Sequence, residues 1–140
     1  MGPPRLIVDT GPLYAYVDAR DAAHAACVEL LQTTAEPLIV PALAIAEAAY
    51  LIGTRLGAES EARFVGDLAA GAFWVDAPRP ADWLRIAELI ARYRDLPLGT
   101  IDGSVIAAAE RLNITTIATL DRKHFSIVRP NHAPAFDLLP

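Results

Sequence analysis

The pattern of hydrophobic and polar residues alternates along the chain between short apolar runs and longer stretches with helical spacing. The short runs predict strands at 5–9, 38–40, 73–75 and 114–120. The longer stretches place apolar side chains three or four positions apart and predict helices at 13–17, 22–35, 42–55, 59–68, 81–94 and 100–113. Beyond residue 121 the pattern predicts no element.

The order of these segments predicts an α/β fold. Strands that alternate with helices form a mainly parallel sheet covered by helices on both faces, and ligands of such sheets bind beyond the carboxyl ends of the strands. Asp9 and Asp121 each follow a predicted strand, so we expect both at that edge. The chain of 140 residues contains no linker or internal repeat, which predicts a single domain over 1–140.

The composition predicts a globular chain with a substantial core, because 54% of the residues are hydrophobic and 21% are charged. No charge-free stretch approaches the ~18 residues that a membrane span needs, and Asp9 interrupts the beginning before an apolar signal region. We therefore expect a cytoplasmic protein without a membrane partner. The single cysteine, Cys27, cannot form an internal disulfide, and no cysteines and histidines have zinc-site spacing.

Three carboxylates stand alone in long apolar neighbourhoods. Asp9 is the only charged residue over 6–17, Glu47 over 37–52, and Asp102 over 96–109. Helical spacing places Glu47 and Asp102 on the apolar sides of their predicted helices. A buried, unpaired carboxylate costs several kcal/mol, so such a group is neutralised, paired or bound to metal.

Each acid also has an ordinary structural explanation when it is considered singly. Asp9 and Asp102 can cap helices, and Glu47 can pair with a distant arginine. Together the three favour a shared cation site. Asp121 joins them through its place after the strand at 114–120, although its neighbours Arg122 and Lys123 also suit a polar turn.

An all-oxygen set of ligands, with no cysteine and no histidine placed to join it, suits Mg²⁺ or Mn²⁺. Such a cluster lowers the pKa of a water and stabilises charge on a phosphate, which favours phosphodiester hydrolysis. The formal charge of -5 argues against a polyanionic substrate. That objection weakens when four carboxylates are bound to metal.

The stretches IVDTGPLYAYVD, VPALAIAEAAYL, LPLGTIDGSVIAAAERL and ATLDRKHF, in this order and spacing, resemble the PIN-domain nucleases and, within them, the toxins of VapBC toxin–antitoxin pairs. The resemblance spans almost the whole chain. Two positions depart from the usual pattern: Gly11 replaces Ser or Ala, and Gly103 replaces Ala.

The resemblance implies a PIN-like fold with Mg²⁺ or Mn²⁺ bound by Asp9, Glu47, Asp102 and Asp121 as the catalytic residues. It also implies an endoribonuclease toxin that cleaves structured RNA, often transfer or ribosomal RNA. Cleavage by metal-activated water would leave 5′-phosphate and 3′-hydroxyl ends. The expected partners are the RNA, a VapB-like antitoxin that neutralises the toxin, and a second copy in a homodimer.

Several neighbouring residues have both a functional and a structural interpretation. Thr10 and Thr119 resemble the polar residues beside the family's acids, but threonine is also a common strand former. Arg122 and Lys123, with His124, either contact RNA phosphates or form a solvated turn. Trp74 and Trp83 are either core residues or a dimer contact, or they stack on an unpaired base. A further set, expected to be exposed, forms either a groove for an antitoxin or part of a dimer contact: the apolar residues Leu13, Tyr14 and Tyr16.

Two alternatives to a ribonuclease remain open. The chain is either a catalytically inactive PIN-like module that binds RNA or protein, or a nuclease that acts on DNA or flap structures. The presence of all four acids argues against an inactive module, because acids that cost stability need a function. A haloacid-dehalogenase phosphatase requires a second aspartate two residues after the first, and that position is Gly11.

Overall fold

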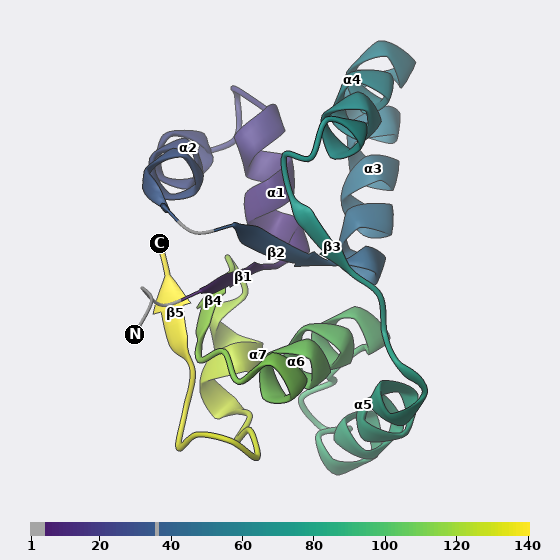
Figure 1. Ribbon diagram of the computed structural model, residues 1–140, viewed down its shortest axis with the longest axis vertical. Coiled ribbons are helices and arrows are strands. Elements are labelled where there is room, and N and C mark those ends of the chain that lie inside the picture. The colour runs from purple at the N-terminus through teal and green to yellow at the C-terminus, as the bar shows by residue number, and fades with distance from the viewer. Residues whose placement is uncertain (1–4, 36) are drawn as a thin grey trace.

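The computed structural model describes residues 5–35 and 37–140, and it has the predicted α/β architecture (Figure 1). In chain order the elements are β1 (Leu6–Val8), α1 (Thr10–Val17), α2 (His24–Thr33), β2 (Leu38–Pro41), α3 (Ala42–Leu56), α4 (Ala58–Ala69), β3 (Trp74–Asp76), α5 (Pro80–Arg92), α6 (Thr100–Leu112), β4 (Thr116–Ala118), α7 (Arg122–Ile127) and β5 (Asp137–Leu139).

The strands form one parallel sheet in the order β3-β2-β1-β4-β5. The central strand β1 pairs Ile7 with Ile39 of β2 and with Ile117 of β4. Parallel strands need crossover connections, and the helices provide them. The carboxyl ends of β1 and β4 therefore lie side by side, which brings the residues that follow them together.

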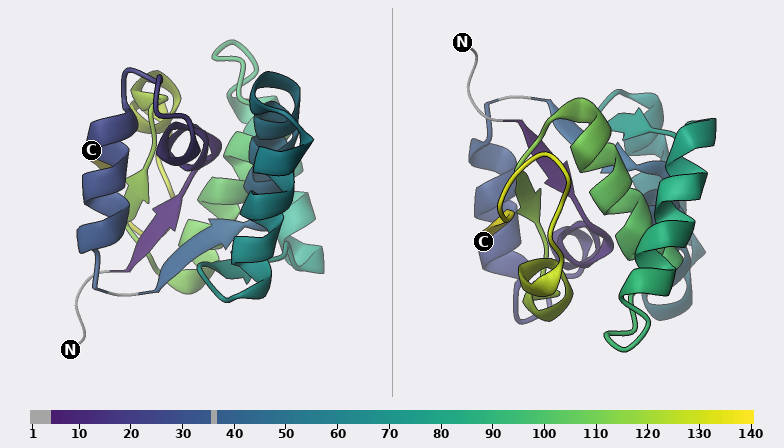
Figure 2. Two further views of the ribbon diagram at one scale, coloured as in Figure 1. Left: turned by 90° about the horizontal axis from the view of Figure 1, so that it is seen from above. Right: turned by 90° about the horizontal axis from the view of Figure 1, so that it is seen from below.

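Helices cover both faces of the sheet, as expected. In Figure 1, α1 to α4 lie above the sheet and α5 to α7 lie below it, and the views of Figure 2 each show one of these layers in front of the sheet. The alternation of side chains along β1 accounts for the two cores: Leu6 and Val8 pack in the cluster with α1 and α3, and Ile7 packs in the cluster with α6 and α7. Each layer thus buries one apolar face of the sheet.

Helices α5 and α6 pack closely because Gly103 lacks a side chain. A Cβ at Gly103 would lie 3.0 Å from Cγ2 of the buried Ile86. Two arginine clusters join the same layer: Arg85 bonds both carboxylate oxygens of Glu110 at 2.8 and 2.9 Å, and Arg111 bonds Asp76 and Asp82. This layer positions the first turn of α6.

The structure adds two elements that the sequence did not predict, α7 and β5. Strand β5 pairs with β4 through hydrogen bonds such as Thr119 N–H to Leu139 O at 2.8 Å. Its three residues are too few to show an alternating pattern, and α7 has only six residues.

Some expectations about burial were wrong. Of the interpretations for Trp74 and Trp83, only the core is excluded, because 53% and 48% of their surfaces are exposed, on the edge strand β3 and on α5; a dimer contact and base stacking stay open. Leu13 and Tyr14 lie on the buried face of α1, so only Tyr16 of the apolar set expected on the surface is partly exposed. Among the residues that the structure describes, no helix is long and apolar enough to cross a membrane.

Candidate active site

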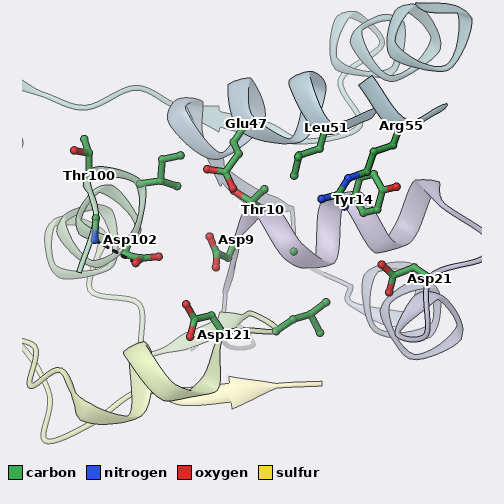
Figure 3. Close-up of a pocket in the computed structure, with 14 residues that line it drawn as sticks. Asp9, Thr10, Tyr14, Asp21, Glu47, Leu51, Arg55, Thr100, Asp102 and Asp121 are labelled. Atoms are coloured by element: carbon green, nitrogen blue, oxygen red, sulfur yellow. Dashed lines mark hydrogen bonds between the residues drawn. The ribbon is translucent and has the colours of Figure 1, made fainter. Parts of the chain in front are cut away.

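The four predicted acids line one pocket of about 770 Å³ at the carboxyl edge of the sheet. Asp9 follows β1, Asp121 precedes α7, Glu47 projects from the middle of α3, and Asp102 lies in the first turn of α6. Figure 3 shows the side chains of these acids around a common space. The fold therefore brings together residues that are up to 112 positions apart, from Asp9 to Asp121.

Asp9 is the most buried of the four acids, with 6% of its surface exposed. Burial raises the pKa of its carboxyl from 3.8 to about 6, and repulsion by Asp102 and Asp121 acts in the same direction. Hydrogen bonds from the Thr10 backbone and the Thr119 hydroxyl oppose this rise in pKa. The ionised form of Asp9 thus lacks a compensating cation in the described structure.

The two threonines expected beside the acids both lie in the site. The Thr119 hydroxyl donates to Asp9 Oδ2 at 3.0 Å and accepts from the Asp121 backbone N–H, also at 3.0 Å. The Thr10 hydroxyl is buried in the pocket wall and has no hydrogen-bond partner among the described residues. An unsatisfied buried hydroxyl at this place is a potential donor or acceptor for a bound group.

A histidine lies among the carboxylates, contrary to expectation. His124 Nδ1 is 2.8 Å from Asp121 Oδ2 and 3.0 Å from Asp102 Oδ2. Asp121 caps α7 by accepting from the His124 backbone N–H at 3.2 Å, so the first turn of this helix brings the imidazole back to the acids. No periodic pattern in the sequence marked this position, because α7 has only six residues.

Glu47 faces the pocket together with residues one and two turns further along α3. Leu51 and Arg55 follow at i+4 and i+8 and line the same cavity, while Ala44, Ala48 and Ile52 form the buried stripe. Tyr50, three residues after Glu47, lies outside this buried stripe and is 67% exposed. Sequence reasoning also missed Arg55, which lies just outside the apolar stretch around Glu47.

Arg122 and Lys123 lie beside the site at the beginning of α7. The Arg122 guanidinium donates to the backbone oxygens of Pro140, at 2.8 Å, and Leu138. Lys123 is exposed. Arg122 thus ties the end of the chain to α7, and Lys123 is open to solvent.

The donors present fit a hard divalent cation. Four carboxylates face one space, the most buried has a raised pKa, and a buried hydroxyl next to it lacks a partner. A cation in this space would compensate the charge of Asp9 and reduce the repulsion among the acids. The imidazole of His124 adds one nitrogen donor near Asp102 and Asp121.

Comparison with known proteins identifies the family of the chain and supports this description of the fold. The model of the PIN-domain family matches residues 6–129. The chain is 36% identical over 135 residues to Ribonuclease VapC26 of Mycobacterium tuberculosis, covering 96% of this chain and 100% of that protein.

Several solved structures have the same fold. VapC20 of M. tuberculosis, described as a sarcin-ricin loop cleaving toxin, aligns with a TM-score of 0.75 and 17% identity over 80% of this chain and 86% of that chain. FitAcB from Neisseria gonorrhoeae aligns with a TM-score of 0.63 and 19% identity over 96% of each chain. VapBC2 from Rickettsia felis, bound to a fragment of promoter DNA, aligns with a TM-score of 0.66 and 15% identity over 95% of this chain and 96% of that chain.

Proposed function

The chain belongs to the PIN-domain family, among its VapC members, and from this we propose that it is a metal-dependent endoribonuclease, the toxin of a VapBC pair. The observation that carries the proposal is the convergence of Asp9, Glu47, Asp102 and Asp121 on one pocket. We propose that these four acids are the catalytic and metal-binding residues. We also propose that residues 1–140 form a single domain.

Asp9, Glu47, Asp102 and Asp121 would hold Mg²⁺ or Mn²⁺. The bound ion supplies an activated water and neutralises charge that develops on the phosphate. Asp9 must be ionised to take part, and the Thr119 hydroxyl holds one of its oxygens in place. Asp102 and Asp121 are more open than Asp9, so they form the side of the pocket that faces an incoming phosphodiester.

The proposed substrate is a structured RNA, transfer or ribosomal. VapC20, which shares the fold, is described as cleaving the sarcin-ricin loop. Because the protein is compact, with little room for a separate module that reads bases, we expect it to recognise the shape of an RNA and an accessible loop. An RNA substrate of this kind also implies action in the cytoplasm. Lys123, next to the acids, is proposed to contact the RNA backbone, and Arg122 to do so in addition to its bonds with the chain end.

The proposed partners are a VapB-like antitoxin and a second copy of the chain. Two of the structures with this fold, FitAcB and VapBC2, support a partner of this kind. A toxin without its antitoxin would cleave cellular RNA continuously. Neutralisation therefore belongs to the same proposal as the nuclease activity.

The test is RNA cleavage by the purified protein with Mg²⁺, Mn²⁺ or EDTA, using transfer and ribosomal RNA. We compare the wild type with Asp102→Asn and Glu47→Gln, and with Asp95→Asn as a matched control at an exposed site outside the pocket. We expect cleavage only with metal, a loss of more than about 100-fold in both pocket variants, and wild-type activity in the control. Added metal should also raise the melting temperature of the wild type more than that of Asp102→Asn.

Circular dichroism checks that each variant is folded. A wild type that binds RNA but cleaves none of these substrates with either metal would favour the inactive binding module. Cleavage of DNA in preference to RNA would favour the other alternative. A melting temperature that does not respond to Mg²⁺ or Mn²⁺ would remove the shared metal site.

A further inference from the structure

We propose that Arg55 binds a phosphate of the RNA backbone other than the one that is cleaved, an inference that rests on the proposed ribonuclease function. Arg55 is the only lysine or arginine among the described residues that line the pocket of the four acids. The acids at one end of the pocket suit a metal ion with the scissile phosphodiester, and the guanidinium of Arg55 at the other end suits a second phosphate. None of the other described side chains that line the pocket carries a positive charge for that second phosphate.

The position of Arg55 follows from helix geometry. Glu47, Leu51 and Arg55 are spaced by four residues, so they share one face of α3 and line one cavity. Eight residues advance a helix by about 12 Å. Figure 3 shows Glu47 near the other acids and Arg55 at the far end of the same row, beside Tyr14. Arg55 therefore starts about two helical turns along α3 from Glu47, which places it towards a neighbouring phosphate of the chain.

The guanidinium of Arg55 is held in place by an aromatic ring. Its Cζ lies 5.0 Å from the centroid of the Tyr14 ring. Tyr14 is itself buried and donates its hydroxyl to Asp18 Oδ2 at 2.6 Å, which fixes the ring. Stacking on a ring face leaves the N–H groups at the guanidinium edge available, and these groups match the oxygens of a phosphate.

Arg55 is exposed and has no carboxylate partner among the described residues, whereas the partly buried Arg85 and Arg111 each have one or more. Arg85 and Arg111 bond Glu110, Asp76 and Asp82 at 2.5 to 3.1 Å. Arg55 forms no ion pair with a carboxylate of the described residues. Asp21, which also lines the pocket, accepts from the Ala23 backbone N–H at 2.8 Å. The charge of Arg55 is thus available to an anion that enters the pocket.

An RNA strand provides such an anion. When one phosphodiester of the RNA lies at the acids, the nucleotides on one side of it continue along the pocket, and each of them carries another phosphate. Contacts of this kind fix the register of a nucleic acid and carry no base specificity. Arg55 is therefore a binding residue that positions the substrate.

The experiment compares Arg55→Gln and Arg55→Lys with Arg92→Gln as a matched control. Arg92 also stacks on a tyrosine, with its Cζ 5.7 Å from the Tyr93 ring, but it lies outside the pocket. We measure kcat and KM with Mn²⁺ on an RNA hairpin that the wild type cleaves. We also measure the Kd of a fluorescein-labelled RNA hairpin in an Asp102→Asn background, as a function of salt.

We expect Arg55→Gln to raise KM and Kd about tenfold and to leave kcat within about twofold. The slope of log Kd against log salt should fall by about 0.7 to 1, the contribution of one phosphate. The rise in melting temperature with Mn²⁺ should be unchanged, because the acids are intact. Arg55→Lys should recover part of the affinity, and Arg92→Gln should behave like the wild type.

A second measurement locates the phosphate. Single neutral methylphosphonates placed along the cleavable hairpin should weaken wild-type binding at one position near the scissile bond, and Arg55→Gln should show no further loss there. An unchanged salt slope and Kd in Arg55→Gln would overturn the inference and leave Arg55 a residue that packs on Tyr14. If the wild type cleaves RNA and Arg55→Gln behaves like the wild type, the role of Arg55 is wrong and the proposed nuclease function stands. If the wild type binds RNA through Arg55 but cleaves none, the nuclease function is wrong and the phosphate site stands. If the wild type does not bind RNA, both are wrong.

Discussion

The hydroxyl of Thr119 donates a 3.0 Å hydrogen bond to Oδ2 of Asp9, although 110 residues separate the two in the sequence. Both residues are buried, at the ends of the neighbouring strands β1 and β4. The same hydroxyl accepts from the Asp121 backbone N–H at 3.0 Å. One side chain therefore sets the positions of two candidate metal ligands.

We predict that Thr119→Val weakens metal binding by about tenfold or more, the range found for residues that orient ligands. Valine keeps the size of the side chain, but it removes the hydrogen bond that lowers the pKa of Asp9. Asp9 then competes less well for a cation against a proton. Isothermal titration with Mn²⁺ gives the affinity, and thermal unfolding gives the stability.

Thr33→Val is the matched control, because that exposed hydroxyl donates only to carbonyl oxygens of its own helix, at 2.7 Å to Glu29 O. Thr119→Ser should recover most of the Mn²⁺ affinity. A Thr119→Val protein that is less stable but binds Mn²⁺ as tightly as the wild type would show that the hydrogen bond serves the fold alone.

The acids could be predicted from the sequence because a buried charge is costly. Asp9, Glu47 and Asp102 each interrupt a long apolar stretch, and the structure places all three in one pocket. Asp121 was found through its place after a strand, since parallel strands bring their ends together. The order of strands and helices predicted the parallel sheet for the same reason.

Other features of the site depend on contacts that no local pattern records. His124 reaches the acids through a helix of six residues, which is too short to show a period. Arg55 lies next to Leu56 and Gly57 at the end of α3, where a charged residue is an ordinary helix ending. The exposure of Trp74 follows from the place of β3 at the edge of the sheet, which the sequence does not specify.

The raised pKa of Asp9 predicts how stability and metal binding depend on pH. Its pKa is about 6 in the folded protein and 3.8 in the unfolded chain, so between these values the folded protein holds a proton that the unfolded chain has released. In EDTA, the contribution of Asp9 to the free energy of unfolding should therefore fall as the pH rises through this window, by up to about 3 kcal/mol. Above about pH 7 it should be constant.

Urea denaturation of the wild type and Asp9→Asn at several pH values measures this contribution, because asparagine does not titrate. The stability of Asp9→Asn relative to the wild type should increase as the pH rises from about 4 to about 7. Metal has the opposite dependence: its affinity should decline as the pH falls below about 6, since protons compete for Asp9. A difference between the two proteins that is independent of pH would contradict the burial of an uncompensated carboxylate.

The contact of His124 with two acids predicts a difference between metals. Imidazole nitrogen is a better ligand for Co²⁺ than for Mg²⁺, which prefers oxygen. We expect His124→Gln to reduce Co²⁺ affinity about tenfold and to change Mg²⁺ affinity by less than about threefold. The absorption spectrum of bound Co²⁺ should also shift when a nitrogen ligand is lost.

His24→Gln is the control for this experiment. Its Nδ1 lies 2.7 Å from the Ala15 carbonyl oxygen, and the residue does not line the pocket. Equal losses of affinity for Co²⁺ and Mg²⁺ in His124→Gln, with an unchanged Co²⁺ spectrum, would mean that the imidazole orients Asp102 and Asp121 without binding metal.

Arg111 joins α6 to α5 and β3 and supports a prediction about stability alone. Its guanidinium bonds both oxygens of Asp76 and, at 2.9 Å, Oδ2 of Asp82, and all three side chains are less than one fifth exposed. Arg111→Met leaves two carboxylates without their cation, so the free energy of unfolding should fall by about 3 kcal/mol in urea denaturation. The same change at the exposed Arg92 should cost less than about 0.5 kcal/mol. Mn²⁺ affinity should stay at the wild-type value, because Arg111 does not line the pocket. A loss in Arg111→Met no larger than that in Arg92→Met would show that solvent already screens this cluster.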